Sequence, residues 1–90
     1  MRRFELGLVV ATPGALEVLG SLEVSPSELV ERHASGDWGD VPSEDARENE
    51  LALECGFRVM SSYPLPGEVC VWVITEADRS STCLLLPEEY

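Results

Sequence analysis

The segment from Val69 to Thr75 constrains the fold most, because its first six residues are all apolar and four of them are β-branched. This composition predicts a β-strand. Alternate side chains of a strand point to opposite faces, so Cys70, Trp72 and Ile74 would share one face and the three valines the other. A strand that is apolar on both faces needs cover on both. We therefore expect helices on one face of the sheet and a partner subunit on the other, which would make the protein a homodimer.

Two further strands are predicted around this segment. Residues 57–63 alternate apolar and polar side chains, and residues 81–86 are largely apolar. Turn-forming residues at 64–67 and 76–79 separate the three strands, which predicts an antiparallel meander. A similar alternation over residues 4–10 predicts an N-terminal strand.

The residues between these strands carry helix signals. Thr12 followed by Pro13 indicates a helix that ends at Gly20, and Ser25 with Glu28 forms a capping-box pattern for a second helix that ends near residue 35. A third helix is expected over residues 43–55. The chain of 90 residues is thus predicted to be one α+β domain, with an N-terminal strand, two or three short helices and the meander packed on them.

The charge is strongly acidic, with 17 acidic residues against six arginines, no lysine and a formal net charge of −11. Binding to nucleic acid or to an anionic membrane requires a clustered basic face, so neither is expected. An acidic chain suits a basic protein partner. The three cysteines are odd in number and form no C-x-x-C pair, and the sequence has no secretion signal or membrane-spanning run, which predicts a cytoplasmic location.

The loop from His33 to Asp40 contains the only histidine, and two hypotheses apply to it. His33, Asp37 and Asp40 could be catalytic in a small hydrolase or nuclease, with or without a metal ion. Alternatively, Asp37 or Asp40 accepts hydrogen bonds from backbone N–H groups near the start of the third helix. Gly36 should end the helix before Asp37, and the spacing matches no known metal motif, so neither a metal site nor a cofactor is predicted.

Candidate binding residues are Trp38 in that loop and a polar cluster made by Glu76, Asp78 and Arg79. Arg79 could hold a carboxylate or phosphate through two hydrogen bonds. The alternative is a hairpin turn in which Asp78 caps the backbone and Arg79 pairs locally. Trp38 would either cover the core or anchor a partner.

Three stretches carry a resemblance to a known family: V-A-T-P-G-A-L at residues 10–16, R-H-A-S-G-D-W-G-D at 32–40, and W-V-I-T-E-A-D-R-S-S-T-C-L-L-L-P-E-E-Y at 72–90. Together they resemble small bacterial proteins called plasmid-related, some of which are labelled as subunit M of a type I restriction endonuclease. A methylase subunit needs a cofactor-binding loop and a target-base motif, and this chain has neither. The resemblance therefore implies a bacterial or plasmid origin and assigns no functional residue.

Two classes of function follow. The first is a non-enzymatic acidic interaction module, whose forms include a DNA mimic that occupies the basic cleft of a nuclease and a dimerisation unit. The second is the hydrolase or nuclease based on His33, Asp37 and Asp40. Convergence of these three side chains in one pocket would favour the enzyme.

Overall fold

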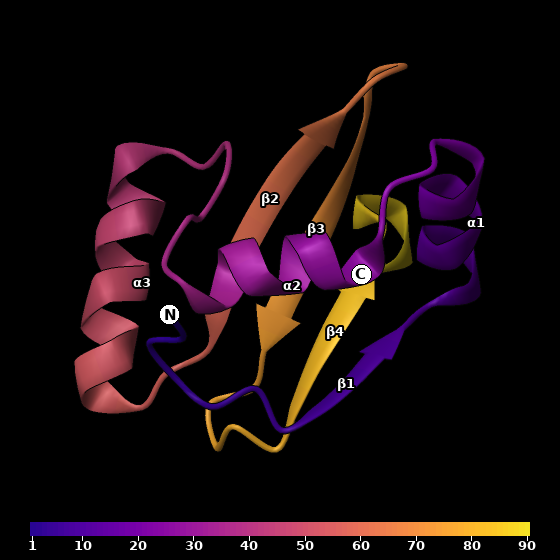
Figure 1. The fold of residues 1–90 in the computed structure, drawn as a ribbon. Coiled ribbons are helices and arrows are strands. Elements are labelled where there is room, and N and C mark those ends of the chain that lie inside the picture. The colour runs from indigo at the N-terminus through magenta and orange to yellow at the C-terminus, as the bar shows by residue number, and fades with distance from the viewer.

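The computed structural model describes residues 1–90 as an α+β fold with one four-stranded sheet (Figure 1). Its radius of gyration of 12.3 Å is that expected of a single compact chain of this length. The elements in chain order are β1 (Leu8–Ala11), α1 (Pro13–Ser21), α2 (Pro26–Ala34), α3 (Ser43–Cys55), β2 (Val59–Leu65), β3 (Val69–Thr75), β4 (Ser81–Leu85) and the short 3-10 helix η1 (Pro87–Glu89).

The sheet confirms the predicted meander and corrects the expectation of a purely antiparallel sheet. The strand order is β1-β4-β3-β2, so β3 is an interior strand that pairs antiparallel with both β2 and β4. Strand β1 pairs with β4 in the parallel direction. A parallel pair needs a long connection, and here the three helices and the first two meander strands lie between its members.

Strand β1 is shorter than the predicted strand over residues 4–10. Gly7 has a φ of +65°, and a Cβ atom there would lie 2.4 Å from the carbonyl oxygen of Arg79. A left-handed backbone in such a close approach requires glycine and interrupts an extended strand. The chain turns at Gly7, and regular pairing with β4 begins only at Leu8.

The three predicted helices are confirmed to within about one residue at each end. Thr12 caps α1, where its hydroxyl oxygen accepts from the N–H of Ala15 at 3.1 Å. Ser25 precedes α2 as expected, but its side chain makes no capping hydrogen bond and contacts the hydroxyl of Ser27 instead. No helix combines the length and the apolar character that crossing a membrane requires.

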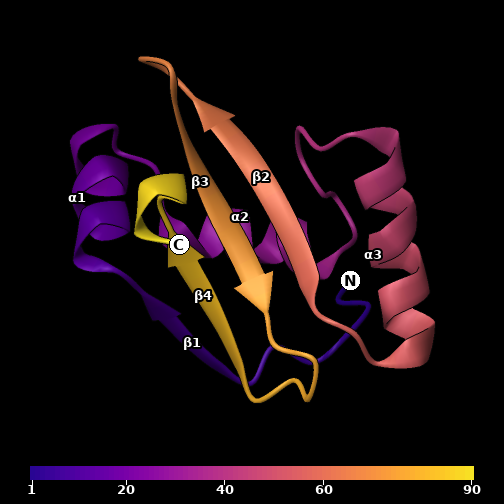
Figure 2. The same cartoon turned by 180° about the vertical axis from the view of Figure 1, so that it is seen from behind.

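Helix α2 covers one face of the sheet, which we call the inner face (Figure 1). Its buried residues pack with apolar side chains of β2, β3 and β4 in a core that also takes in α1. Helix α3 lies beside β2, at the far edge of the sheet from α1 (Figure 1). In the view from behind, the sheet lies between the viewer and α2, and η1 with the C-terminus lies on the viewer's side of the sheet (Figure 2). This second face is the outer face.

The outer face is covered in part by the C-terminal residues of the same chain, where we had expected a partner subunit. The rings of Tyr90 and Trp72 meet edge to face, with centroids 5.7 Å apart, and Arg58 donates to the hydroxyl of Tyr90 at 2.8 Å. Ile74 and Leu85 are buried, whereas Trp72 is half-buried. The apolar character of this face therefore does not by itself require a dimer.

Glu89 fastens this C-terminal cover to the start of α1. The hydroxyl of Thr12 donates to its carboxylate at 2.6 Å, and the N–H of Leu86 donates at 2.8 Å. The hydrogen bond from Thr12 is the main cause of a lowered pKa for Glu89. A carboxylate near a helix N-terminus is also favoured by the helix dipole.

The β2 edge of the sheet is closed by hydrogen bonds from outside the sheet. The Asn49 side chain donates to the carbonyl of Met60 at 2.8 Å and accepts from its N–H at 3.1 Å. The loop before α3 continues this pairing: the N–H of Asp40 donates to the carbonyl of Ser62, and the N–H of Ser62 donates to the carbonyl of Trp38. Asn49 is itself 5% exposed, and its amide takes the place of a neighbouring strand at this edge.

We expect Asn49→Ala to lower the free energy of unfolding by about 2 kcal/mol, because both backbone groups of Met60 then lose their partners in a partly buried place. Urea denaturation measures the loss. Glu48→Ala, an exposed change on the same helix, is the matched control and should change stability by less than about 0.5 kcal/mol. Equal effects of the two changes would contradict the role given to Asn49.

Candidate functional site

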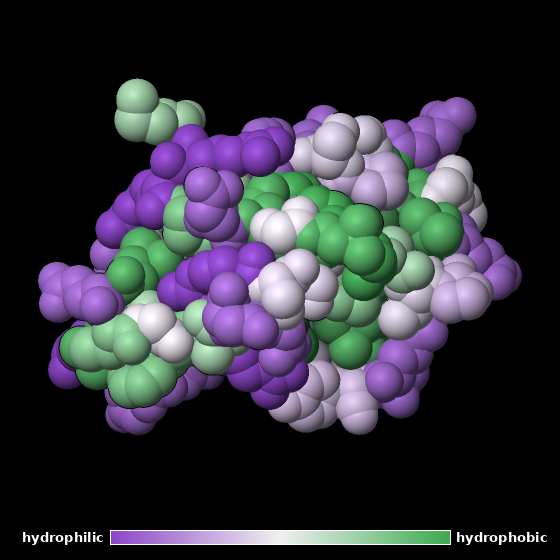
Figure 3. Space-filling view, turned by 90° about the horizontal axis from the view of Figure 1, so that it is seen from below, coloured by the Kyte–Doolittle hydropathy of each residue, from purple (hydrophilic) through white to green (hydrophobic).

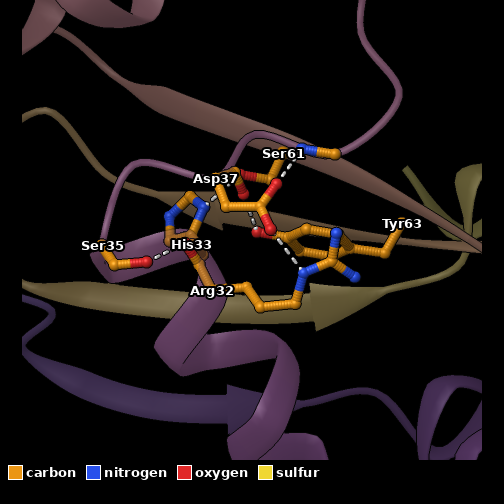
Figure 4. Close-up of polar contacts among 7 residues, drawn as sticks. Arg32, His33, Ser35, Asp37, Ser61 and Tyr63 are labelled. Atoms are coloured by element: carbon orange, nitrogen blue, oxygen red, sulfur yellow. Dashed lines mark hydrogen bonds and ion pairs between the residues drawn. The ribbon is translucent and has the colours of Figure 1, made fainter.

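His33 lies in the last turn of α2 and points into the sheet, where it is fully buried. Its Nδ1 atom lies 2.6 Å from the hydroxyl oxygen of Ser61 on β2, and its Nε2 atom lies 2.9 Å from that of Thr75 on β3. Figure 4 shows the imidazole directed toward Ser61. Both ring nitrogens are thus occupied by side chains of the same protein.

The hydrogen bonds continue from Thr75 to Thr82, and the last of them fixes which group donates and which accepts at every step. Thr82 on β4 donates its hydroxyl to the carbonyl of Leu6 at 2.7 Å, so it must accept from Thr75, 2.7 Å away. Thr75 in turn accepts from His33, which places the imidazole proton on Nε2 and leaves Nδ1 to accept from Ser61. All four side chains are buried with every polar atom satisfied. We call this set the histidine network.

The imidazole is neutral in this environment. Burial lowers the pKa of His33 from 6.5 to about 4, with a smaller contribution from the positive charge of Arg79. A general base must reach a substrate proton. This ring has no contact with solvent and no free nitrogen, so its arrangement suits a structural role.

Asp37 organises the loop after α2 (Figure 4). Its carboxylate accepts from the guanidinium of Arg32 at 2.7 Å and from the N–H of Gly39 at 3.1 Å. The hydrogen bond from Arg32 is the main cause of a lowered pKa for Asp37. The Asp37 carbonyl accepts from the hydroxyl of Tyr63 at 2.6 Å, while the Arg32 guanidinium lies 4.5 Å from the centroid of that ring.

The expectation that Asp37 or Asp40 accepts from the start of the third helix is wrong. Residue Pro42 precedes α3, and no side chain caps that helix. Asp37 accepts from Gly39 within its own loop, and Asp40 contributes only its backbone N–H. The physical reason is that the loop pairs with β2, which fixes Asp40 at the sheet edge before the helix begins.

The structure does not gather the three candidate catalytic residues into one site. His33 is inside the core, whereas Asp37 and Asp40 are exposed on the loop. No group of three His, Cys, Asp or Glu side chains has the geometry to hold a metal ion. A cavity of about 230 Å³ does lie between α3 and the sheet, but these three residues are not among those that line it: Val41, Asp45, Glu48, Asn49, Arg58, Met60 and Ile74.

Trp38 lies in the interior, at 7% exposure, and is therefore not presented to a partner. Its ring stacks near Phe4, with centroids 6.2 Å apart, and meets His33 edge to face at 6.0 Å. The indole N–H donates to Glu50 at 3.2 Å. Trp38 forms a small second core with side chains of α3 and β2.

The polar turn after β3 is held by its own contacts. Asp78 accepts from the N–H of Ser80 at 3.0 Å, and Glu76 lies 3.6 Å from the guanidinium of Arg58. Arg79 donates to the carbonyls of Phe57 at 2.6 Å and Ala52 at 3.1 Å, and so connects this turn to the end of α3. Because its guanidinium donates to these carbonyl groups, fewer of its N–H groups are free to bind an anionic ligand.

Sequence reasoning missed the hydroxyl partners of His33. Ser61 shares the inward face of β2 with Val59 and Tyr63, and Thr75 and Thr82 occupy inward positions on β3 and β4. A hydroxyl at an inward strand position needs a partner. Three such hydroxyls and one histidine on the covering helix are the signal that could have indicated the network.

Comparison of the chain with protein-family models, curated proteins and solved structures gives no match. The resemblance to plasmid-related proteins therefore stays a prediction.

We expect acid to destabilise the protein through His33. Because the pKa is about 4 in the fold and about 6.5 in the unfolded chain, the unfolded state binds the proton first as the pH falls. Stability from this group is complete above pH 6.5 and is lost between pH 6.5 and 4, by about 3 kcal/mol. Denaturation of the wild type and His33→Gln across this range measures the difference in slope. Parallel pH profiles would contradict the neutral, buried imidazole.

We expect Asp37→Ala to lower the free energy of unfolding by about 1 kcal/mol, since Arg32 and the N–H of Gly39 both lose an acceptor at a largely exposed site. Asp40→Ala removes no side-chain hydrogen bond and is the control in the same loop. Thermal denaturation of both variants tests this. A larger loss for Asp40→Ala would show that this carboxylate has a partner that the structure lacks.

Proposed function

We propose that this chain is a non-enzymatic acidic module that binds a basic protein surface. The observation that carries the proposal is that most of the positive charges are neutralised by contacts within the fold, whereas most of the negative charges are not. Five of the six arginine side chains are occupied within the fold, Arg47 on α3 being the exception, whereas most carboxylates are not. Four arginines form ion pairs with acidic residues at 2.7–3.6 Å, namely Arg2 with Glu31, Arg3 with Glu50, Arg32 with Asp37 and Arg58 with Glu76.

The remaining carboxylates supply a negative surface. On α3 alone, Glu44, Asp45, Glu48 and Glu54 are exposed and take part in no ion pair. Summed over a small domain with a net charge of −11, such groups create a field that attracts basic proteins and accelerates their association. A DNA mimic is one form of this proposal, in which the basic surface is the nucleic-acid cleft of an enzyme.

The enzyme hypothesis has less support from the geometry. Its only imidazole is enclosed in the histidine network, and its two aspartates lie on the loop outside. A neutral imidazole with both nitrogens bonded lacks the contact with a substrate that acid–base catalysis requires. We further propose a bacterial cytoplasmic location, which agrees with three free cysteines.

Capture of host proteins on the tagged chain, followed by mass spectrometry, tests this function. We expect basic proteins that bind at low salt and are released at high salt, because salt screens exposed charges. A variant with Glu44, Asp45 and Glu48 changed to glutamine should capture less of the same proteins. The matched control changes Leu51, exposed on the same helix, to glutamine and leaves the charge intact. Capture that is indifferent to salt and to the carboxylates would overturn the proposal.

A further inference from the structure

The two edges of the sheet differ in a way that points to a docking strand. At the β2 edge, Asn49 and the loop from Trp38 to Asp40 occupy the outward backbone groups. At the other edge, β1 pairs with β4 alone, and no strand follows it in the sheet. An open edge presents a row of unpaired N–H and C=O groups to any extended chain.

The hydrogen bonds of β1 show which groups are free. The N–H groups of Leu8 and Thr12 donate toward β4, to the carbonyls of Ser80 and Leu84, both at 3.0 Å. Backbone groups of successive residues in a strand point to opposite sides, so those of Val9 and Ala11 point away from β4. These two residues offer two donors and two acceptors along the open edge.

The side chains of β1 form an exposed apolar strip. Leu8, Val9 and Val10 are 70%, 45% and 42% exposed. Figure 3, which views the molecule from below Figure 1, shows strongly hydrophobic atoms gathered in the middle of this side with hydrophilic atoms around them. Natural edge strands are commonly protected by being short or by a charged side chain, a proline or a bulge. Strand β1 is short, but its four residues include no charged side chain and no proline.

Carboxylates lie at both ends of this strip. At its start, Glu5 is exposed, and Asp78 belongs to the turn whose backbone touches Gly7. At its end, Glu89 is bonded to Thr12. The open edge is thus an apolar strand between acidic groups, which is complementary to an extended segment that carries both apolar and basic side chains.

We propose that an extended basic segment of a partner protein docks on β1 as a fifth strand of the sheet. This inference rests on the proposed function: it assigns the backbone contacts with the partner to β1, while the carboxylates of α3, at the other edge of the sheet, contribute to the field of the whole domain. Backbone hydrogen bonds to Val9 and Ala11 would give affinity, and alternate side chains would select apolar and basic residues. A second copy of this chain fits less well, because a four-residue strand is short for a stable dimer and both copies carry the same net charge.

A synthetic peptide of alternating valine and lysine residues is the probe, with a valine–glutamate peptide as its counterpart. We expect the basic peptide to bind and to protect the amides of Val9 and Ala11 from hydrogen exchange, as followed by NMR. The acidic peptide should not bind. Protection at α3 in place of β1 would overturn the proposal, as would concentration-dependent protection of β1 without peptide, which indicates a second copy.

The variant Val10→Lys places a positive charge on β1, and Leu51→Lys makes the same change in net charge at a similarly exposed site on α3. We expect Val10→Lys to weaken peptide binding about tenfold, and more than Leu51→Lys does. Circular dichroism checks that both variants fold. If Val10→Lys still captures the host partners while the α3 glutamine variant does not, the proposed function stands and the docking strand is rejected.

Discussion

The buried histidine network is the interaction on which the rest of the structure depends. The imidazole on α2 bonds to hydroxyl groups on β2 and β3, the hydroxyl on β3 bonds to one on β4, and this last hydroxyl donates to the carbonyl of Leu6 before β1. These polar groups are favourable in the core only while each has its partner, since an unpaired buried group is costly. The network therefore fixes how the covering helix, the meander and the N-terminal segment fit together.

The need to give polar groups a hydrogen-bond partner also explains the contacts at the periphery of the fold. Asn49 completes the β2 edge, Glu89 fastens the C-terminal residues to α1, and Arg79 connects the turn after β3 to the end of α3. Arg79, a candidate binding residue in the sequence, thus serves to satisfy backbone carbonyl groups. Strand β1 is the exception, because the backbone groups on its outward edge have no partner within the chain. This open edge is why we propose a docking strand there.

Charge gives the second line of argument about function. Every arginine except Arg47 is engaged within the fold, in an ion pair or with carbonyl groups, while several carboxylates of α3 take part in no ion pair. An acidic surface directs encounter with a basic partner, and an open strand provides specific backbone contacts. Together the two features support the proposed interaction module, whereas the enzyme hypothesis depends on an imidazole that is buried in the core.

The sequence by itself determined the local elements: Pro13, Pro26 and Gly56 mark helix ends, and the apolar run from Val69 identifies the interior strand, because these signals act over a few neighbouring residues. Only the tertiary structure decided the rest. The parallel pairing of β1, the cover that Tyr90 gives to Trp72 and the hydrogen bonds of the histidine network join residues that are far apart in the sequence. The bond from Thr82 to Leu6 spans 76 positions. Such contacts depend on how the layers pack, and local spacing carries no record of them.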